Sequence, residues 1–188
     1  SMLIMAMGSF IFNLILNNPF AVAAFQTASR IEHLFFLPII SISSSMVTLV
    51  GMFFGAERFD LLKGIVRYGL KAGILFSCLC TIFFYFTAKH IIPFFTDSRE
   101  IINISISYFG IVCFSYPFVT IGMTSSRIMQ GLGHGQPTLI LTLIRVVLIN
   151  APLGYIITRV MDLPISYVWV SILISSFVAS SLGLLWMK

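Results

Sequence analysis

Long apolar stretches separated by short polar segments fill almost the whole chain. A helix needs about 20 apolar residues to cross a bilayer, and at that length the pattern predicts six membrane-spanning segments. They cover residues 2–16, 21–54, 68–88, 102–129, 138–157 and 165–186. Backbone polar groups in lipid must be satisfied within the protein, which a helix achieves by itself. The pattern therefore predicts an all-α fold, a polytopic membrane bundle of six transmembrane helices.

The second apolar stretch, residues 21–54, is too long to cross a bilayer upright. As one helix it would measure about 50 Å, against a hydrocarbon core of about 30 Å. Pro38 lies near its middle, and a proline removes a backbone hydrogen bond and clashes with the preceding turn. We therefore expect a kink there. Pro117 and Pro152 interrupt two later spans. Neighbouring groups can satisfy the carbonyls that such prolines leave without a hydrogen bond. Three prolines within six spans nevertheless favour a transporter with broken helices around a cavity.

Composition agrees with a membrane protein and argues against a nucleic-acid-binding protein. Of the 188 residues, 59% are hydrophobic and 9% are charged, whereas soluble domains are about 45–50% apolar and about 25% charged. The net charge of +5 comes from scattered Lys and Arg, without the basic run that nucleic-acid binding would favour. Most of these cations lie near the second and fourth linkers and the C-terminus. The positive-inside rule therefore predicts that these parts are cytoplasmic.

No motif in the chain indicates an enzyme, a metal site or a cofactor. The glycines of residues 131–135 lack both the lysine of a phosphate-binding loop and a preceding strand, so they predict a tight turn between spans. His33, His90 and His134 belong to three different segments, without metal-ligand spacing. The serines of residues 41–45 lack a nucleophile motif. In membrane helices such serines more often allow close helix approach and cross-helix hydrogen bonds.

Glu32 is the acidic residue placed well inside a predicted span, about 17 Å along the helix from Ala21. Ionisable groups are costly in lipid, so such a residue indicates a function or a specific partner. Two interpretations stay open, an ion pair with another span and a protonatable group beside a transport cavity. Arg30 lies two residues earlier, on nearly the opposite side of the helix, and is expected to orient or anchor the segment.

Several short motifs occur in an order and spacing that resemble one known family. They are RIE at 30–32, LFFLP at 34–38, LVG at 49–51, GA at 55–56, YPF at 116–118, the QG, G and PT of 130–138, and Arg145 beyond them. Together they resemble the C-terminal half of a multidrug and toxic compound extrusion (MATE) transporter. The resemblance extends over nearly the whole chain.

The resemblance implies a parent protein of twelve helices in two lobes. Residues 1–188 would be the C-terminal lobe, helices seven to twelve, with the N-terminal lobe missing from this chain. Such a transporter exports amphipathic cations, using protons or sodium ions as the coupling ion and no cofactor. The partners would be small-molecule amphipathic cations, the lipid bilayer of a bacterial inner membrane and the missing N-terminal lobe, with no nucleic acid.

The transporter hypothesis, together with the in-span polar residues and prolines, leads to a set of candidate side chains. Candidates for the substrate cavity or for coupling are Glu32, Asn13, Gln26, Tyr116 and Gln130, and candidates for structural or orienting roles are Arg30, Pro38, Pro117 and Arg145. One branch of the family carries coupling acids in the seventh and tenth helices, but residues 2–18 and 102–129 contain none. Coupling would then depend on the missing lobe or on Glu32. Two alternatives stay open, a flippase of lipid-linked saccharides and a non-transporting structural subunit.

Overall fold

The structure is a computed structural model that describes residues 8, 10, 11, 13, 16, 18–160 and 166–187, without the side chains of residues 35, 159 and 160. Its α-helices are α2 (Pro19–Gly55), α3 (Phe59–Ile91), α4 (Arg99–Val112), α5 (Tyr116–Gly131), α6 (Gln136–Leu143), α7 (Ala151–Tyr155) and α8 (Ser166–Trp186). The segments η1 (Ile92–Phe94) and η2 (Cys113–Ser115) are 3-10 helical, and η3 (Ile144–Asn150) and η4 (Ile156–Val160) are π-helical. The all-α prediction is confirmed.

Five segments of the described chain are long and apolar enough to cross a membrane. They are Phe36–Gly55, Phe59–Phe94, Arg99–Gly131, Gln136–Thr158 and Ser166–Trp186. The protein is therefore an integral, multi-pass membrane protein. The first predicted span, residues 2–16, lies mostly outside the described residues.

The third span begins earlier than the predicted range of residues 68–88, because its helix already starts at Phe59. The structure has a tight turn, in which the Arg58 amide donates to the Phe53 carbonyl at 3.0 Å and Glu57 adopts a positive φ of 56°. Helix α3 begins immediately afterwards, at Phe59. The charged residues Asp60, Lys63 and Arg67, which lie before the predicted start of this span, belong to the first turns of α3.

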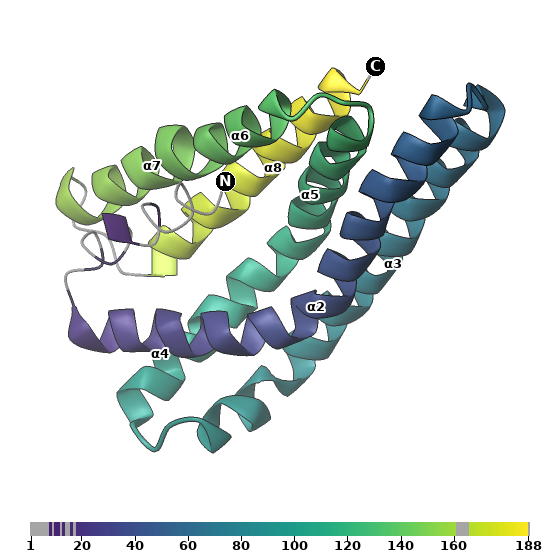
Figure 1. Cartoon of the computed structure of the whole chain (residues 1–188). Helices are drawn as coiled ribbons and strands as arrows, with labels where there is room; N and C mark the ends of the chain where they lie inside the picture. The colour runs from purple at the N-terminus through teal and green to yellow at the C-terminus, as the bar shows by residue number, and fades with distance from the viewer. Residues whose placement is uncertain are drawn as a thin grey trace.

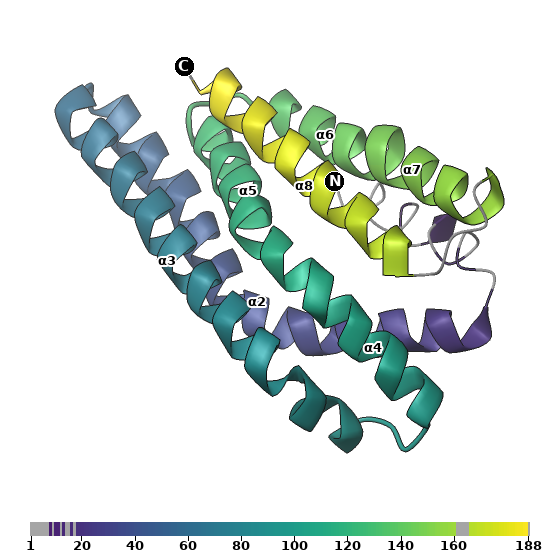
Figure 2. The same cartoon turned by 180° about the vertical axis from the view of Figure 1, so that it is seen from behind.

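Helix α2 changes direction near its middle, as Figures 1 and 2 show: its first arm runs across the molecule and its second rises beside α3. Pro38 lies inside this continuous helix. It cannot donate a backbone hydrogen bond to the preceding turn, so the predicted kink has a local cause. The bend sets the direction of the arm that carries Glu32.

The other two in-span prolines mark breaks in regular α-helix, as predicted. Pro117 follows η2, and together they divide the fourth predicted span into α4 and α5. Pro152 lies in the short α7, between the π-helical segments η3 and η4. Both breaks change the direction or phase of the side chains on either side.

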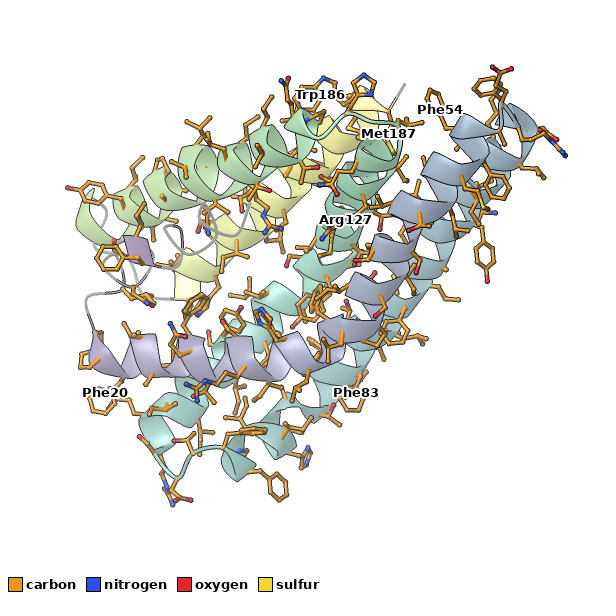
Figure 3. The ribbon with its side chains drawn as sticks, in the orientation of Figure 1. Phe20, Phe54, Phe83, Arg127, Trp186 and Met187 are labelled. Atoms are coloured by element: carbon orange, nitrogen blue, oxygen red, sulfur yellow. The ribbon has the colours of Figure 1, made fainter. Side chains whose placement is uncertain are left out.

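Two buried clusters hold the helices together. One surrounds Phe84, Phe109, Tyr116 and Trp169, and the other is formed by Met46, Val50 and Ile128 with Met187 packed against it. The second cluster gathers the second arm of α2, the first turns of α3, the end of α5 and the C-terminal end of α8 in the upper part of the molecule (Figures 1 and 3). These are the parts that the Lys and Arg distribution assigns to one side of the membrane.

Small and hydroxylated residues let α2 and α5 approach closely. Ser43 and Thr124 share a hydrogen bond of 3.0 Å between their hydroxyl oxygens, and both residues are buried. The cross-helix role predicted for the serines of α2 thus holds for Ser43, whereas Ser41 and Ser45 are exposed and donate to carbonyls of their own helix. Nearer the end of both helices, a Cβ on Gly131 would lie 2.8 Å from the Val47 carbonyl oxygen and 2.8 Å from Val50 Cβ. Gly131 thus allows a contact that a larger residue would block.

Replacing Gly131 by alanine is expected to destabilise the bundle. Its methyl group would meet the backbone of α2, so the two helices would have to separate, at a cost of about 1–3 kcal/mol. A lower midpoint in thermal unfolding of the detergent-purified protein would show this. Gly64→Ala is the matched control, because a Cβ there meets nothing within 4 Å and helix propensity favours alanine. Equal stability of the two variants would contradict the close packing.

Candidate functional site

The carboxylate of Glu32 is bound by two tyrosine hydroxyls from a neighbouring span. Tyr108 of α4 donates to Glu32 Oε2 at 3.1 Å, and Tyr116 of α5 donates to Oε1 at 2.7 Å. Each carboxylate oxygen therefore accepts one hydrogen bond. Glu32 itself lies on the first arm of α2, six residues before Pro38. Half-buried and satisfied in this way, its carboxylate is the centre of the candidate site.

The two tyrosines reach the same carboxylate from different helical segments. They lie eight residues apart, on either side of the 3-10 segment η2, so their Cα atoms would be about 12 Å apart along a regular helix. Their hydroxyls nevertheless reach the two oxygens of one carboxylate, so the two side chains converge on Glu32 from either side of η2. Hydroxyls at these two levels can therefore bind a single side chain of α2.

Aromatic rings hold both tyrosines in place. The Tyr116 ring meets Phe36 of α2 edge-on at 5.1 Å and Phe84 of α3 at 5.9 Å, both measured between centroids. The Tyr108 ring meets Trp169 of α8 edge-on at 4.9 Å. Each such contact is worth about 0.5–1.5 kcal/mol beyond its buried area. Residues from α2, α3 and α8 thus fix the positions from which the hydroxyls bind Glu32.

One interpretation of the sequence was that Glu32 forms an ion pair with another span. Among the described residues, Glu32 forms no such pair. The partners of Glu32 do come from another span, but they are neutral hydroxyls. Arg30 is exposed, and no described side chain pairs with it. The His33 ring is hydrogen-bonded to the Ser29 carbonyl of its own helix at 2.8 Å. Hydroxyl donors satisfy a carboxylate without adding a counter-charge, so the site keeps a net negative charge when Glu32 is ionised.

The structure brings some of the other predicted site residues together and leaves others apart. Gln26 Nε2 donates to Asn13 Oδ1 at 3.4 Å, which joins a residue of the first predicted span to α2. Gln130 accepts from Arg127 Nη1 at 3.1 Å. It lies fourteen residues beyond Tyr116, about 21 Å along a helix. Glu32 and Tyr116 thus form one contact and Gln26 and Asn13 another on the same arm of α2, whereas Gln130 lies near the opposite end of its span. Figure 3 shows Arg127 on the upper part of α5.

Tyr108 was missed by the sequence reasoning. A tyrosine inside an apolar stretch carries no charge and attracts no attention by itself. A signal was nevertheless present: Ser107–Tyr108 and Ser115–Tyr116 repeat the same dipeptide eight residues apart, in one predicted span that faces the only in-span carboxylate of the predicted spans. Two tyrosine hydroxyls eight residues apart in one span are thus candidate hydrogen-bond partners for an acid within another span.

Two further predictions concern Arg145, expected to have a structural or orienting role, and metal binding, for which the sequence shows no motif. Arg145 is half-buried in η3, near the middle of the span Gln136–Thr158. Within the described part of the chain, no group of three or more His, Cys, Asp or Glu side chains could hold a metal ion.

Comparison with known proteins gives one consistent result. The family model MatE matches residues 1–156. The chain is 26% identical over 165 residues to a probable multidrug resistance protein NorM of Thermotoga maritima, which covers 88% of this chain and 36% of that protein. It is 24% identical over 153 residues to a protein of the same name from Bacillus cereus, which covers 81% of this chain and 34% of that protein.

Comparison with solved structures also points to transporters of this kind. A MOP superfamily transporter from Pyrococcus furiosus superposes with a TM-score of 0.92 at 26% identity, covering 98% of this chain and 42% of that one. An outward-facing multidrug resistance MATE family transporter of the MOP superfamily gives a TM-score of 0.93 at 26% identity, with the same coverage of 98% and 42%. The chain spans little more than a third of the length of the curated relatives that it matches.

Proposed function

The chain belongs to the MatE family, and from this premise we propose that it is one lobe of a multidrug exporter. The lobe, residues 1–188, would correspond to the C-terminal half of a two-lobe transporter. Substrates would be amphipathic cations, expelled in exchange for protons or sodium ions by rocking of the lobes about a cavity near the bilayer midplane. The names of the curated relatives and their greater length support this proposal.

The observation that carries the proposal is the carboxylate of Glu32 held between Tyr108 and Tyr116. Glu32 lies on α2 four residues before its membrane-crossing segment, Phe36–Gly55, and its hydroxyl partners belong to the span Arg99–Gly131. An ionisable group held against a membrane span is costly and rare, and typically belongs to an ion or substrate pathway. The ionised carboxylate accepts from both hydroxyls. A protonated carboxyl instead carries a donor of its own, so one tyrosine hydroxyl must turn from donor to acceptor. Proton binding would thus weaken the hydrogen bonds between α2 and the α4–α5 span, because they are no longer assisted by the carboxylate charge.

A sodium ion would act on the same contact in a different way. It would compete with the hydroxyl hydrogens for the carboxylate oxygens and use the tyrosine oxygens as ligands, since hard cations prefer oxygen ligands. Either ion would alter the same hydrogen bonds, on the arm of α2 that precedes the bend at Pro38. At such a bend, a small change in the hydrogen bonds of one arm can alter the angle between the two arms of the helix.

Gradient-driven uptake into vesicles tests the proposal. The protein is reconstituted as its gene encodes it, and a fluorescent amphipathic cation is offered under a proton gradient, a sodium gradient or neither. We expect accumulation that depends on one of the two gradients and collapses when an ionophore dissipates it. Uptake of the dye that is the same with and without both gradients would contradict the proposed exchange.

A further inference from the structure

Three basic side chains follow one another along one side of α3. Lys63, Arg67 and Lys71 are spaced by four residues, which places them on successive turns of the helix. They extend over about 12 Å along the helix axis, and all three are exposed. Helix α3 lies at the edge of the molecule in Figures 1 and 2. We call these three residues the basic stripe of α3.

No acidic side chain of the described lobe neutralises the basic stripe. Asp60 is the one acid in the sequence of α3, and it pairs with Arg58 at 3.6 Å. Glu57 is exposed in the turn before the helix. Among the described residues, none forms an ion pair or a side-chain hydrogen bond with the stripe. The stripe therefore presents three positive charges that can attract an anion from outside the lobe.

The basic stripe ends where the hydrocarbon core begins. The apolar segment that contains α3, Phe59–Phe94, has 36 residues, or about 54 Å as a helix, against a core of about 30 Å. Even a tilt of about 40° leaves it longer than the core is thick. Between Lys71 and Lys89 no residue is charged, a distance of about 27 Å that nearly matches the core. Lys71 is thus at the edge of the core, and Arg67 and Lys63 lie at the level of the lipid headgroups.

Apolar side chains continue the same side of α3 toward the middle of the membrane. Leu75 follows Lys71 by four residues and Ile82 follows it by eleven, so both lie near the line of the stripe. Both are exposed. Tyr68, next to Arg67, is also exposed, and tyrosines are enriched at the membrane interface. Basic groups, a tyrosine and then apolar side chains, in this order, match the headgroup and the acyl chains of a phospholipid.

We propose that the basic stripe binds the phosphate of an anionic phospholipid whose acyl chains lie along Leu75 and Ile82. Lysine and arginine both bind phosphate, and arginine can do so through two parallel hydrogen bonds. Each basic residue near the membrane surface adds to the attraction for anionic lipids. A zwitterionic phospholipid carries its own cation beside the phosphate, so the stripe selects lipids by their net charge. Such a site would be present whether or not the chain exports drugs.

Native mass spectrometry of the detergent-purified protein counts bound lipids and tests this site. The protein, as its gene encodes it, is titrated with phosphatidylglycerol and, in parallel, with phosphatidylcholine of the same acyl chains. The stripe variant combines Arg67→Gln with Lys71→Gln. Its matched control combines Lys89→Gln with Arg99→Gln, which removes two exposed basic residues outside the stripe, and Arg67→Lys keeps the charge. Thermal unfolding without added lipid checks that each variant is folded.

We expect wild type to bind phosphatidylglycerol in preference to phosphatidylcholine, and the stripe variant to bind the first phosphatidylglycerol on the order of 30-fold more weakly, the effect of losing two basic residues near the membrane surface. The control pair should bind like wild type, and Arg67→Lys should keep most of the affinity. Equal binding by wild type and the stripe variant, or equal losses in the stripe variant and the control pair, would overturn the inference.

Inorganic phosphate distinguishes a lipid from a free anion at the same stripe. We expect it to leave phosphatidylglycerol bound, because the acyl chains hold the lipid along the apolar side chains of α3. Displacement of the lipid by phosphate would show that the stripe binds anions without regard to the acyl chains, and would overturn the inference as well.

Discussion

Replacing Glu32 by glutamine should abolish most of the gradient-driven transport while leaving the protein folded. The amide can still accept from one tyrosine and donate to the other, so the contact between α2 and the α4–α5 span is kept. It can neither take up a proton nor carry the charge that attracts a sodium ion. Coupling between two ligands is typically worth about 1–3 kcal/mol, or about 5- to 150-fold, and we expect a loss within that range.

Uptake of a fluorescent cation into vesicles measures this loss, and Glu100→Gln is the control. Glu100 is an exposed acid in the first turn of α4, so its replacement removes the same charge outside the membrane core. Drug binding without a gradient should persist in Glu32→Gln. Wild-type uptake by that variant would assign coupling to another part of the protein.

Replacing Tyr116 by phenylalanine should destabilise the lobe more than replacing Tyr108. The Tyr116 hydroxyl makes the shorter of the two bonds to Glu32, 2.7 Å against 3.1 Å, and both tyrosines are buried. Loss of the Tyr116 hydroxyl leaves Glu32 Oε1 without a donor in a place from which water is largely excluded. From the worth of hydrogen bonds to charged groups and of polar contacts between membrane helices, we expect a cost of about 1–2 kcal/mol.

A double-mutant cycle isolates this interaction from the packing of the rings. Unfolding free energies of wild type, Tyr116→Phe, Glu32→Gln and the double variant give the coupling between the two side chains. We expect a coupling of at least about 0.5 kcal/mol, because the hydroxyl binds the carboxylate more strongly than the amide. Strictly additive effects would mean that the contact contributes nothing to stability. The ring of Tyr116 stays in place in all four proteins, since phenylalanine keeps its contacts with Phe36 and Phe84.

The apolar pattern was sufficient to predict a helical membrane bundle, because twenty-residue apolar runs have few other stable arrangements in lipid. The prolines likewise predicted where helices bend or break, since their effect on the backbone is local. The boundary between α2 and α3 was predicted wrongly for the opposite reason. Charged residues such as Lys63 and Arg67 are compatible with a loop and with a helix end, and only the turn at Glu57 decides between them.

The candidate site was predicted in part. Glu32 and Tyr116 were both expected to matter, yet nothing along the chain shows that the two side chains touch, since 84 residues separate them. An acid in lipid suggested a cation as its partner, whereas the structure satisfies it with two hydroxyls. Tyr108 completes the pair only because the 3-10 segment and Pro117 set the relation between α4 and α5. Such relations depend on how helices pack and are not contained in local sequence patterns.

Infrared difference spectroscopy of Glu32 tests most directly whether this carboxyl exchanges an ion against the drug. Spectra of the reconstituted protein are recorded before and after addition of an amphipathic cation, at constant pH with and without sodium, for wild type and for Glu32→Gln. We predict a change in a carboxyl or carboxylate band that occurs in wild type and is lost in the variant. The same difference spectrum from both proteins would contradict the account, because Glu32 would then keep its ionic state while the drug binds.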